Sequence, residues 1–136
     1  MSFSIKEASE RLGCPAHTIR YYEKEGLLPF IKRDEHGNRL FEQQDLHWIK
    51  LMTCFRATGM PVAALKKIVD LAIAGPQTIP ERRLLLENHK QELKRRQQEL
   101  DDAFEAVDYK LSVYNEIENG KLDAKHGDFK MDDGTQ

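Results

Sequence analysis

Apolar positions near the N-terminus repeat with the spacing of two short helices. Three of them mark one face of the first helix: Ile5, Ala8 and Leu12. Ser4 followed by Glu7 is the pattern of a capping box, in which both side chains bond to free backbone N–H groups. Gly13 ends this helix, and Pro15 opens a second one over residues 17–24. Two helices joined by a tight turn within about 25 residues predict a helix-turn-helix.

The next segment contains two short extended runs around a polar turn. Residues 30–33 and 39–41 have the composition of strands, and the loop 34–38 between them contains Gly37. The segment therefore predicts a small β-hairpin, or wing.

Helical spacing returns after the hairpin. A helix is predicted from residue 42 to residue 58, where Gly59 follows, and Pro61 opens another that ends before Gly75. Their apolar positions are Leu46, Ile49, Leu51, Met52 and Phe55, then Val62, Leu65, Ile68, Val69 and Ala72. With the elements before them, these helices predict a winged helix-turn-helix domain over residues 1–76.

A long helix is predicted for the second half of the chain. Thr78 and Glu81 have the spacing of a capping box, and no Gly or Pro occurs from residue 81 to residue 118. About forty residues make a helix of roughly 60 Å. A heptad series runs along it: Leu86, Leu93, Leu100, Val107 and Tyr114, with Lys90, Gln97, Phe104 and Leu111 at the second seam position. This pattern predicts a coiled-coil dimerisation helix over residues 77–119, and residues 120–136 are expected to form a disordered tail.

Composition narrows the class of protein. The net charge of -2 hides an asymmetry, because residues 1–76 carry 11 Lys and Arg against 9 Asp and Glu, whereas residues 77–136 carry 10 against 14. A phosphate-binding surface is therefore expected in the first part. No run approaches the roughly 20 apolar residues of a membrane span, so a cytoplasmic protein with no membrane partner is expected.

Metal and cofactor sites are not expected. Cys14 and Cys54 lie forty positions apart with no CxxC pair, which argues against a zinc finger or a disulfide framework. His47, His89 and His126 are scattered singly. An enzyme is the least favoured class, because the sequence has neither a nucleophile motif nor a Gly-rich phosphate loop.

Two motifs and the order of the elements resemble one family. The run IRYYEKEGLL over residues 19–28 is similar to the recognition-helix signature of MerR regulators, and GNRLF over residues 37–41 is similar to their wing motif. The motif resemblance covers residues 2 to 75, and the coiled coil agrees by architecture only. Asn38 and Glu42 depart from the family, which often has Tyr and a Ser or Thr helix cap there. The resemblance implies a mainly α protein with a winged helix-turn-helix and a long antiparallel dimerisation helix.

The resemblance also implies a set of residues on the DNA. Arg20 and Tyr22 would contact it from the recognition helix and Arg39 from the wing, with His17, Lys32 and Arg33 as further candidates. An Arg at the start of such a helix reaches guanine O6 and N7 or phosphates, and a Tyr hydroxyl reaches a phosphate. The alternative for Arg20 is a solvated side chain, for Tyr22 a place in the core, and for Arg39 a plain surface charge. Tyr21 is expected to pack inward.

Cys54 is the candidate effector residue. Lys50 lies one turn earlier on the same helical face and would lower the thiol pKa if the sulfur were exposed, whereas sequence chemistry alone favours an inert buried thiol. The resemblance points the other way, because a MerR subgroup with a short C-terminal region and a Cys here is associated with sensing aldehydes, other electrophiles or nitrosative stress. Metal sensors of the family use later thiolates, and no Cys follows Cys54. Cys14, before Pro15, is a lesser redox candidate.

The function expected from these features is transcriptional regulation by a homodimer on double-stranded promoter DNA. The resemblance implies activation by distorting an overlong promoter spacer so that RNA polymerase can engage, at a deformation cost of about 1–10 kcal/mol. The alternatives are an effector-free repressor and, in a different class, a coiled-coil adaptor that binds proteins.

Overall fold

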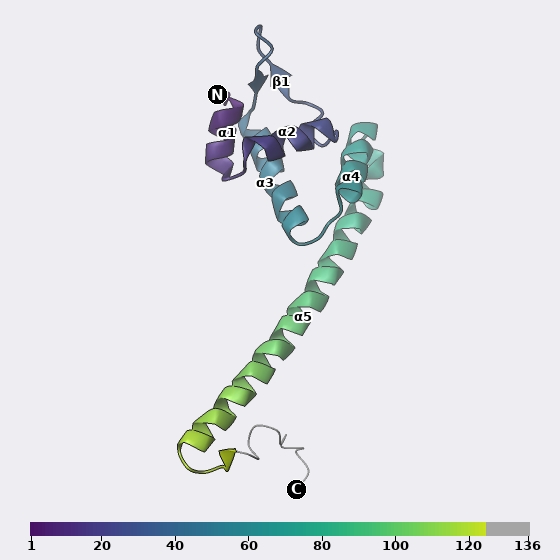
Figure 1. Cartoon of the computed structure of the whole chain (residues 1–136). Coiled ribbons are helices and arrows are strands. Elements are labelled where there is room, and N and C mark those ends of the chain that lie inside the picture. Colours follow the sequence, from purple (N-terminus) through teal and green to yellow (C-terminus); the bar gives the residue numbers. More distant parts are fainter. Residues whose placement is uncertain (125–136) are drawn as a thin grey trace. The chain divides into compact units, whose positions relative to one another are not determined.

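The structure is a computed structural model, and it describes residues 1–124. The chain divides into two compact units, Met1–Lys90 and a second beginning at Gln91 (Figure 1). Most of the tail expected over residues 120–136 lies outside the described residues. The first unit contains α1 (Ile5–Leu12), α2 (Ala16–Lys24), β1 (Lys32–Arg33), β2 (Arg39–Leu40), α3 (Gln43–Ala57), α4 (Val62–Ala74), the 3₁₀ helix η1 (Pro76–Thr78) and the start of α5 (Ile79–Glu118). The mainly helical fold with a small wing is confirmed.

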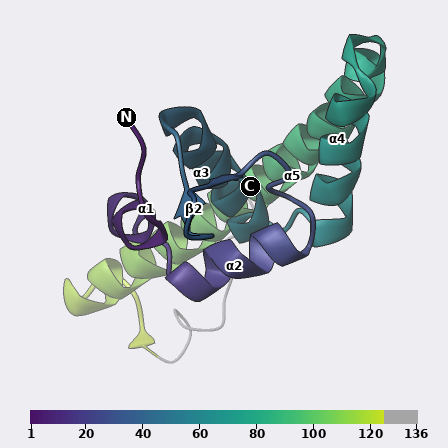
Figure 2. The same ribbon diagram turned by 90° about the horizontal axis from the view of Figure 1, so that it is seen from above.

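The first capping box forms as predicted. The backbone N–H of Glu7 donates to Ser4 Oγ at 3.1 Å, and that of Ser4 donates to Glu7 Oε1 at 3.0 Å. At the other end of α1, Gly13 takes a left-handed conformation with φ 64°, which a side chain would strain. α1 and α2 therefore meet in the tight turn that the helix-turn-helix requires (Figure 2).

The hairpin is shorter than predicted. β1 and β2 are antiparallel, with Lys32 opposite Leu40 and Arg33 opposite Arg39. Asp34 orders the turn, because its Oδ1 accepts the backbone N–H groups of His36 at 2.9 Å and Asn38 at 2.8 Å.

The end of the predicted second strand pairs elsewhere. Phe41 forms an isolated antiparallel bridge with Phe3 and is fully buried. This pairing ties the N-terminal segment to the base of the wing.

Buried apolar side chains join α1, α2, the hairpin, α3 and α4. The largest fully buried ones are Phe41, Ile19, Leu27, Ile49, Met52 and Leu65. Trp48, half-buried on α3, donates its indole N–H to the carbonyl of Leu27 at 3.0 Å. The segment after α2 is therefore held against α3 by both packing and a hydrogen bond.

The capping box predicted at Thr78 and Glu81 is replaced by tertiary contacts. The Thr78 hydroxyl donates toward the carbonyl oxygens of Leu71, at 2.5 Å, and Gly75, at 2.7 Å, and accepts from Arg82 Nε at 3.0 Å. It is thereby engaged by the end of α4, and the 3₁₀ turn η1 leads into α5 instead. A local pattern predicted the start of the helix but not the partner of the hydroxyl.

Candidate nucleic-acid interface

α2 turns two adjacent tyrosines to opposite environments. Tyr22 is 5% exposed within the core, whereas Tyr21 is 46% exposed. The expectation that Tyr21 packs inward is wrong. The burial of Tyr22 also argues against its predicted phosphate contact, and burial raises the pKa of its hydroxyl. Side chains one residue apart on a helix differ in direction by about 100°, so only one can face the core.

Two of the predicted DNA-contacting residues line one groove. Arg20 from α2 and Arg39 from β2 meet there with Asn38 of the wing turn and Ser4 of the α1 cap, around a volume of about 460 Å³. Arg20 is exposed, and Arg39 is partly buried. The groove thus brings together cations from two elements that are 19 positions apart in the chain. Glu7 and Asp34 line the same groove, so its charge is mixed, and the two arginines are the groups in it that can contact the phosphate backbone of DNA.

A carboxylate on α2 fixes the wing. Glu23 Oε1 accepts from Arg39 Nε at 2.7 Å and from Arg33 Nη2 at 3.2 Å. Arg33 also donates through Nη1 to the carbonyl of Gly37 at 2.8 Å. These bonds hold the wing arginines in position and offset part of their charge. The sequence interpretation missed Glu23, because its partners lie 10 and 16 positions further along the chain.

The remaining candidates for DNA contact, Lys32 and His17, lie on the surface. Lys32 forms an ion pair with Glu42 at 2.8 Å, and this contact raises the pKa of Lys32 and lowers that of Glu42. Because the Lys32 side chain is 69% exposed, solvent screens the pair. His17 is exposed on the first turn of α2. Both side chains remain available at the surface.

The two cysteines have different environments. Cys54 is exposed on α3, so the burial that sequence chemistry favoured for this thiol is wrong. Lys50, one turn earlier, is exposed as well. Cys14 is buried, and burial raises the pKa of its thiol.

The end of α3 is connected to α5 within the first unit. The Thr58 hydroxyl lies 3.1 Å from the carbonyl oxygens of both Cys54 and Phe55, toward which it can donate, and 2.8 Å from His89 Nε2. The His89 ring also contacts Phe55 edge-on, with 6.2 Å between ring centroids. One hydroxyl therefore links the backbone of the exposed cysteine to the dimerisation helix.

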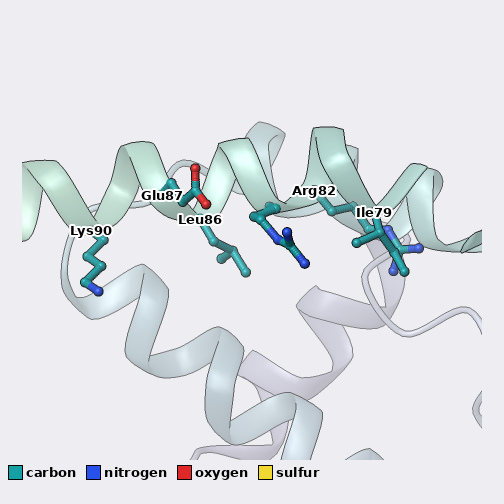
Figure 3. Close-up of a pocket in the computed structure, with 6 residues that line it drawn as sticks. Ile79, Arg82, Leu86, Glu87 and Lys90 are labelled. Atoms are coloured by element: carbon teal, nitrogen blue, oxygen red, sulfur yellow. The ribbon is translucent and has the colours of Figure 1, made fainter. Parts of the chain in front are cut away.

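The predicted dimerisation residues are exposed in the single chain. A pocket of about 340 Å³ lies on the first turns of α5 and is lined by Ile79, Arg82, Arg83, Leu86, Glu87 and Lys90. Figure 3 shows Ile79, Arg82, Leu86, Glu87 and Lys90 along this part of the helix. Leu86 is 40% exposed there. In the second unit the other seam residues have exposed fractions of 36% to 66%: Leu93, Leu100, Phe104, Val107, Leu111 and Tyr114. Such a stripe is the surface that a partner helix would cover.

In the described part of the chain, residues 1–124, no three His, Cys, Asp or Glu side chains gather so as to hold a metal ion. Over the same residues no helix has both the length and the apolar character needed to cross a bilayer.

A helix-turn-helix, a wing fixed to the recognition helix and a long helix with an exposed apolar stripe define a DNA-binding regulator. The model of the MerR HTH family of regulatory proteins matches residues 3–72. The chain belongs to the MerR family of transcriptional regulators.

Relatives and solved structures agree with this assignment. A protein of Haemophilus influenzae, named an uncharacterized HTH-type transcriptional regulator, is 40% identical over 114 residues, which are 84% of each chain. HiNmlR, a MerR family regulator lacking the sensor domain and solved bound to promoter DNA, has a TM-score of 0.78 and 39% identity, covering 88% of this chain and 94% of its own. A MerR family regulator from Listeria monocytogenes has a TM-score of 0.80 and 40% identity, with 84% and 86% covered.

Proposed function

We propose that the chain acts as a homodimer on double-stranded promoter DNA, with residues 1–76 reading the DNA and residues 77–119 forming the dimer. The groove shared by Arg20 and Arg39 carries this proposal. Arg20 contacts base edges or phosphates from α2, and Arg39 offers the backbone of the DNA the N–H groups that Glu23 leaves unused. HiNmlR, 39% identical, was solved on promoter DNA, which supports the same partner here. Lys32, Arg33 and His17 add positive or donor groups beside the groove.

Salt dependence of binding to operator DNA tests the two arginines separately. For Arg39→Ala we expect the slope of log K against log salt to fall by about one per lost phosphate contact. For Arg20→Ala we expect a loss of about 1–3 kcal/mol and relaxed preference at one base pair. Lys50→Ala, which removes an exposed cation outside the groove, is the control. Binding changed less than twofold by both arginine variants would refute the proposed interface.

The proposed mode of regulation is distortion of the promoter spacer, which brings the promoter elements into register for RNA polymerase. Two reading domains held at a fixed spacing by the dimer can supply the deformation energy that one domain cannot. DNA bending measured by circular permutation of the operator, together with transcription by RNA polymerase, tests this mode. A dimer that binds without bending and only lowers transcription would support the alternative, a repressor.

We infer further that Cys54 is the site at which reactive electrophiles act. Its thiol is exposed, and its backbone carbonyl accepts the Thr58 hydroxyl that lies against His89 of α5. The chemistry needs no oxidant: as the thiolate sulfur bonds to the aldehyde carbon, the π bond of the aldehyde opens toward its oxygen, and that oxygen takes the proton that the thiol released, which gives a hemithioacetal. A typical allosteric coupling is about 1–3 kcal/mol, so modification of Cys54 needs to change the contacts of Thr58 and His89 by only this amount.

Competition between the two cysteines tests the sensor proposal. Mass spectrometry after brief alkylation should find Cys54 modified before Cys14, because burial raises the Cys14 pKa and disfavours its thiolate. Cys54→Ala should abolish the transcriptional response to aldehyde, whereas Cys14→Ala should keep it. A response that persists in Cys54→Ala would leave an effector-free regulator as the function.

A further inference from the structure

A third pocket shares no lining residue with the groove of Arg20 and Arg39, and it shares only Arg82 with the pocket on the first turns of α5. It encloses about 290 Å³ between the segment after α2, the first turns of α3, the second half of α4 and the start of α5. Its volume is near the lower end of the range of about 300–1,000 Å³ found for ligand pockets. The pocket therefore suits a small molecule rather than a peptide or a second helix.

One side of this pocket is apolar. Phe30 is 72% exposed at its edge, a high value for a large aromatic side chain, and Trp48 is half-buried beside it. Ile68 and Val69, buried on α4, complete this side. The indole of Trp48 is fixed by its bond to the Leu27 carbonyl, so this wall is ordered in advance of any ligand.

The pocket is also lined by a cation, Arg82. Arg82 is held by two bonds, from Nε to Thr78 Oγ1 at 3.0 Å and from Nη2 to the Gly75 carbonyl at 3.2 Å. Within residues 1–124 no carboxylate forms an ion pair with Arg82, although the side chain is only partly exposed. Its guanidinium has five N–H groups, so donors remain for a bound anion.

We propose that this pocket binds a small organic monocarboxylate with a compact apolar body. The body packs against Phe30, Trp48 and Ile68, and the carboxylate accepts hydrogen bonds from Arg82. Asp45 also lines the pocket, where its Oδ2 accepts the Glu42 backbone N–H at 2.8 Å. Its negative charge disfavours a second acidic group on the ligand, so a dicarboxylate of the same size binds more weakly.

Binding can be measured on the full chain without DNA, so the outcome is independent of the proposed function. Trp48 is the single tryptophan of the sequence, and its fluorescence reports on the pocket directly. The probe is cyclohexanecarboxylate, which does not absorb at the excitation wavelength. Its amide, cyclohexanecarboxamide, matches the shape without the charge, and calorimetric titration detects binding that leaves the fluorescence unchanged.

We expect saturable binding of the carboxylate and at least about tenfold weaker binding of the amide, since charge-assisted hydrogen bonds are lost. Arg82→Gln should weaken carboxylate binding by a similar factor, whereas Arg83→Gln, which changes a neighbouring arginine outside this pocket, should not. Circular dichroism establishes that each variant is folded.

Asp45→Asn provides a gain of binding that misfolding cannot imitate. We expect it to bind cyclohexane-1,4-dicarboxylate more tightly than the unchanged protein does, because the repelling charge is removed. The proposal is overturned if calorimetry detects no carboxylate binding at millimolar concentration. It is equally overturned if acid and amide bind alike, or if Arg82→Gln and Asp45→Asn leave both affinities unchanged.

Discussion

Glu23 on α2 accepts a hydrogen bond from Arg39 Nε on β2 at 2.7 Å, and thereby joins the recognition helix to the wing. The two side chains are 20% and 23% exposed, so this pair is screened less than the surface pairs of the chain. Each hydrogen bond to a charged group contributes about 1.5–3 kcal/mol. The position of the wing against α2 therefore depends on an acidic residue, whose charge would repel DNA bound at the proposed interface.

Replacement of Glu23 by Gln separates these two effects. Removal of a negative charge beside the DNA should strengthen binding to nonspecific DNA, whereas a loosened wing should reduce the preference for the operator. We expect the ratio of operator to nonspecific affinity to fall in Glu23→Gln, measured by titration at two salt concentrations. Glu25→Gln, an exposed position at the end of the same helix, controls for the charge alone. An unchanged ratio would show that the pair does not position the wing.

Two glycines at positive φ test how much backbone conformation contributes to stability. Gly13 has φ 64° with open space at its Cβ position, and Gly26 has φ 78° with Lys66 Nζ 2.7 Å from that position. The left-handed conformation costs about 1–2 kcal/mol for a residue other than glycine, so each Gly→Ala change should lower the free energy of unfolding by that amount. Lys66 can move away from Gly26 and loses only an exposed ion pair with Asp70. Urea titrations should therefore show similar decreases in the free energy of unfolding for Gly13→Ala and Gly26→Ala. A decrease above about 3 kcal/mol in Gly26→Ala alone would contradict this account.

Trp48 should stabilise the reading domain through one hydrogen bond as well as through packing. In Trp48→Phe the Leu27 carbonyl loses the indole N–H that it accepts at 3.0 Å. Loss of a partner for a buried group costs about 1–3 kcal/mol, so we expect the free energy of unfolding to decrease by this amount. Unfolding is measured by circular dichroism. Phe30→Ala, at a position 72% exposed, should change it by less than about 0.5 kcal/mol. Equal losses in the two variants would contradict the role of the hydrogen bond.

The dimer should depend on the apolar stripe of α5. Leu100 is 61% exposed in the single chain, and Leu100→Asp would place a charge in the proposed seam, at a cost of several kcal/mol. We expect this variant to sediment as a monomer at micromolar concentration. Ala106→Asp introduces the same residue on α5 outside both seam series and should remain a dimer. Dimeric Leu100→Asp would remove the coiled coil from the proposed assembly.

Local patterns predicted the elements of this fold, because their causes lie within a few residues. The Ser4–Glu7 capping box and the Gly13 turn form as expected, since each depends on neighbours along the chain. Thr78 differs because its hydroxyl is taken by Leu71, seven residues earlier, once α4 and α5 pack. The partner of the Thr78 hydroxyl could therefore not be predicted from neighbouring residues, because it depends on how α4 and α5 pack.

The candidate site was predicted in part. The cations Arg20 and Arg39 followed from motifs, but the exposure of Tyr21 depends on how α2 is rotated against the core. The Glu23–Arg39 pair and the exposure of Cys54 likewise depend on tertiary packing, which residue type and spacing do not determine.

The link from Cys54 to α5 can be tested without changing Cys54 itself or the residues proposed to contact DNA. Thr58→Val removes the hydroxyl that donates to the Cys54 carbonyl and lies 2.8 Å from His89 Nε2, while the side chain keeps its shape. Thr53→Val is the matched control, because the Thr53 hydroxyl donates to the Lys50 carbonyl of its own helix at 2.8 Å. Both variants are made in a Cys14→Ser background, so that N-ethylmaleimide modifies Cys54 alone.

If the Thr58 hydroxyl transmits the modification, alkylation should still occur at Cys54 in Thr58→Val, since the thiol remains exposed. Its effect on operator affinity, however, should shrink by most of the coupling free energy of about 1–3 kcal/mol, whereas Thr53→Val should keep the full effect. Operator affinity is measured before and after alkylation in the protein with and without Thr58→Val. As in a double-mutant cycle, these four values give the coupling free energy between the Thr58 hydroxyl and the modification of Cys54. An alkylation effect of the same size in Thr58→Val would place the route from Cys54 through other contacts, such as the Phe55–His89 ring pair.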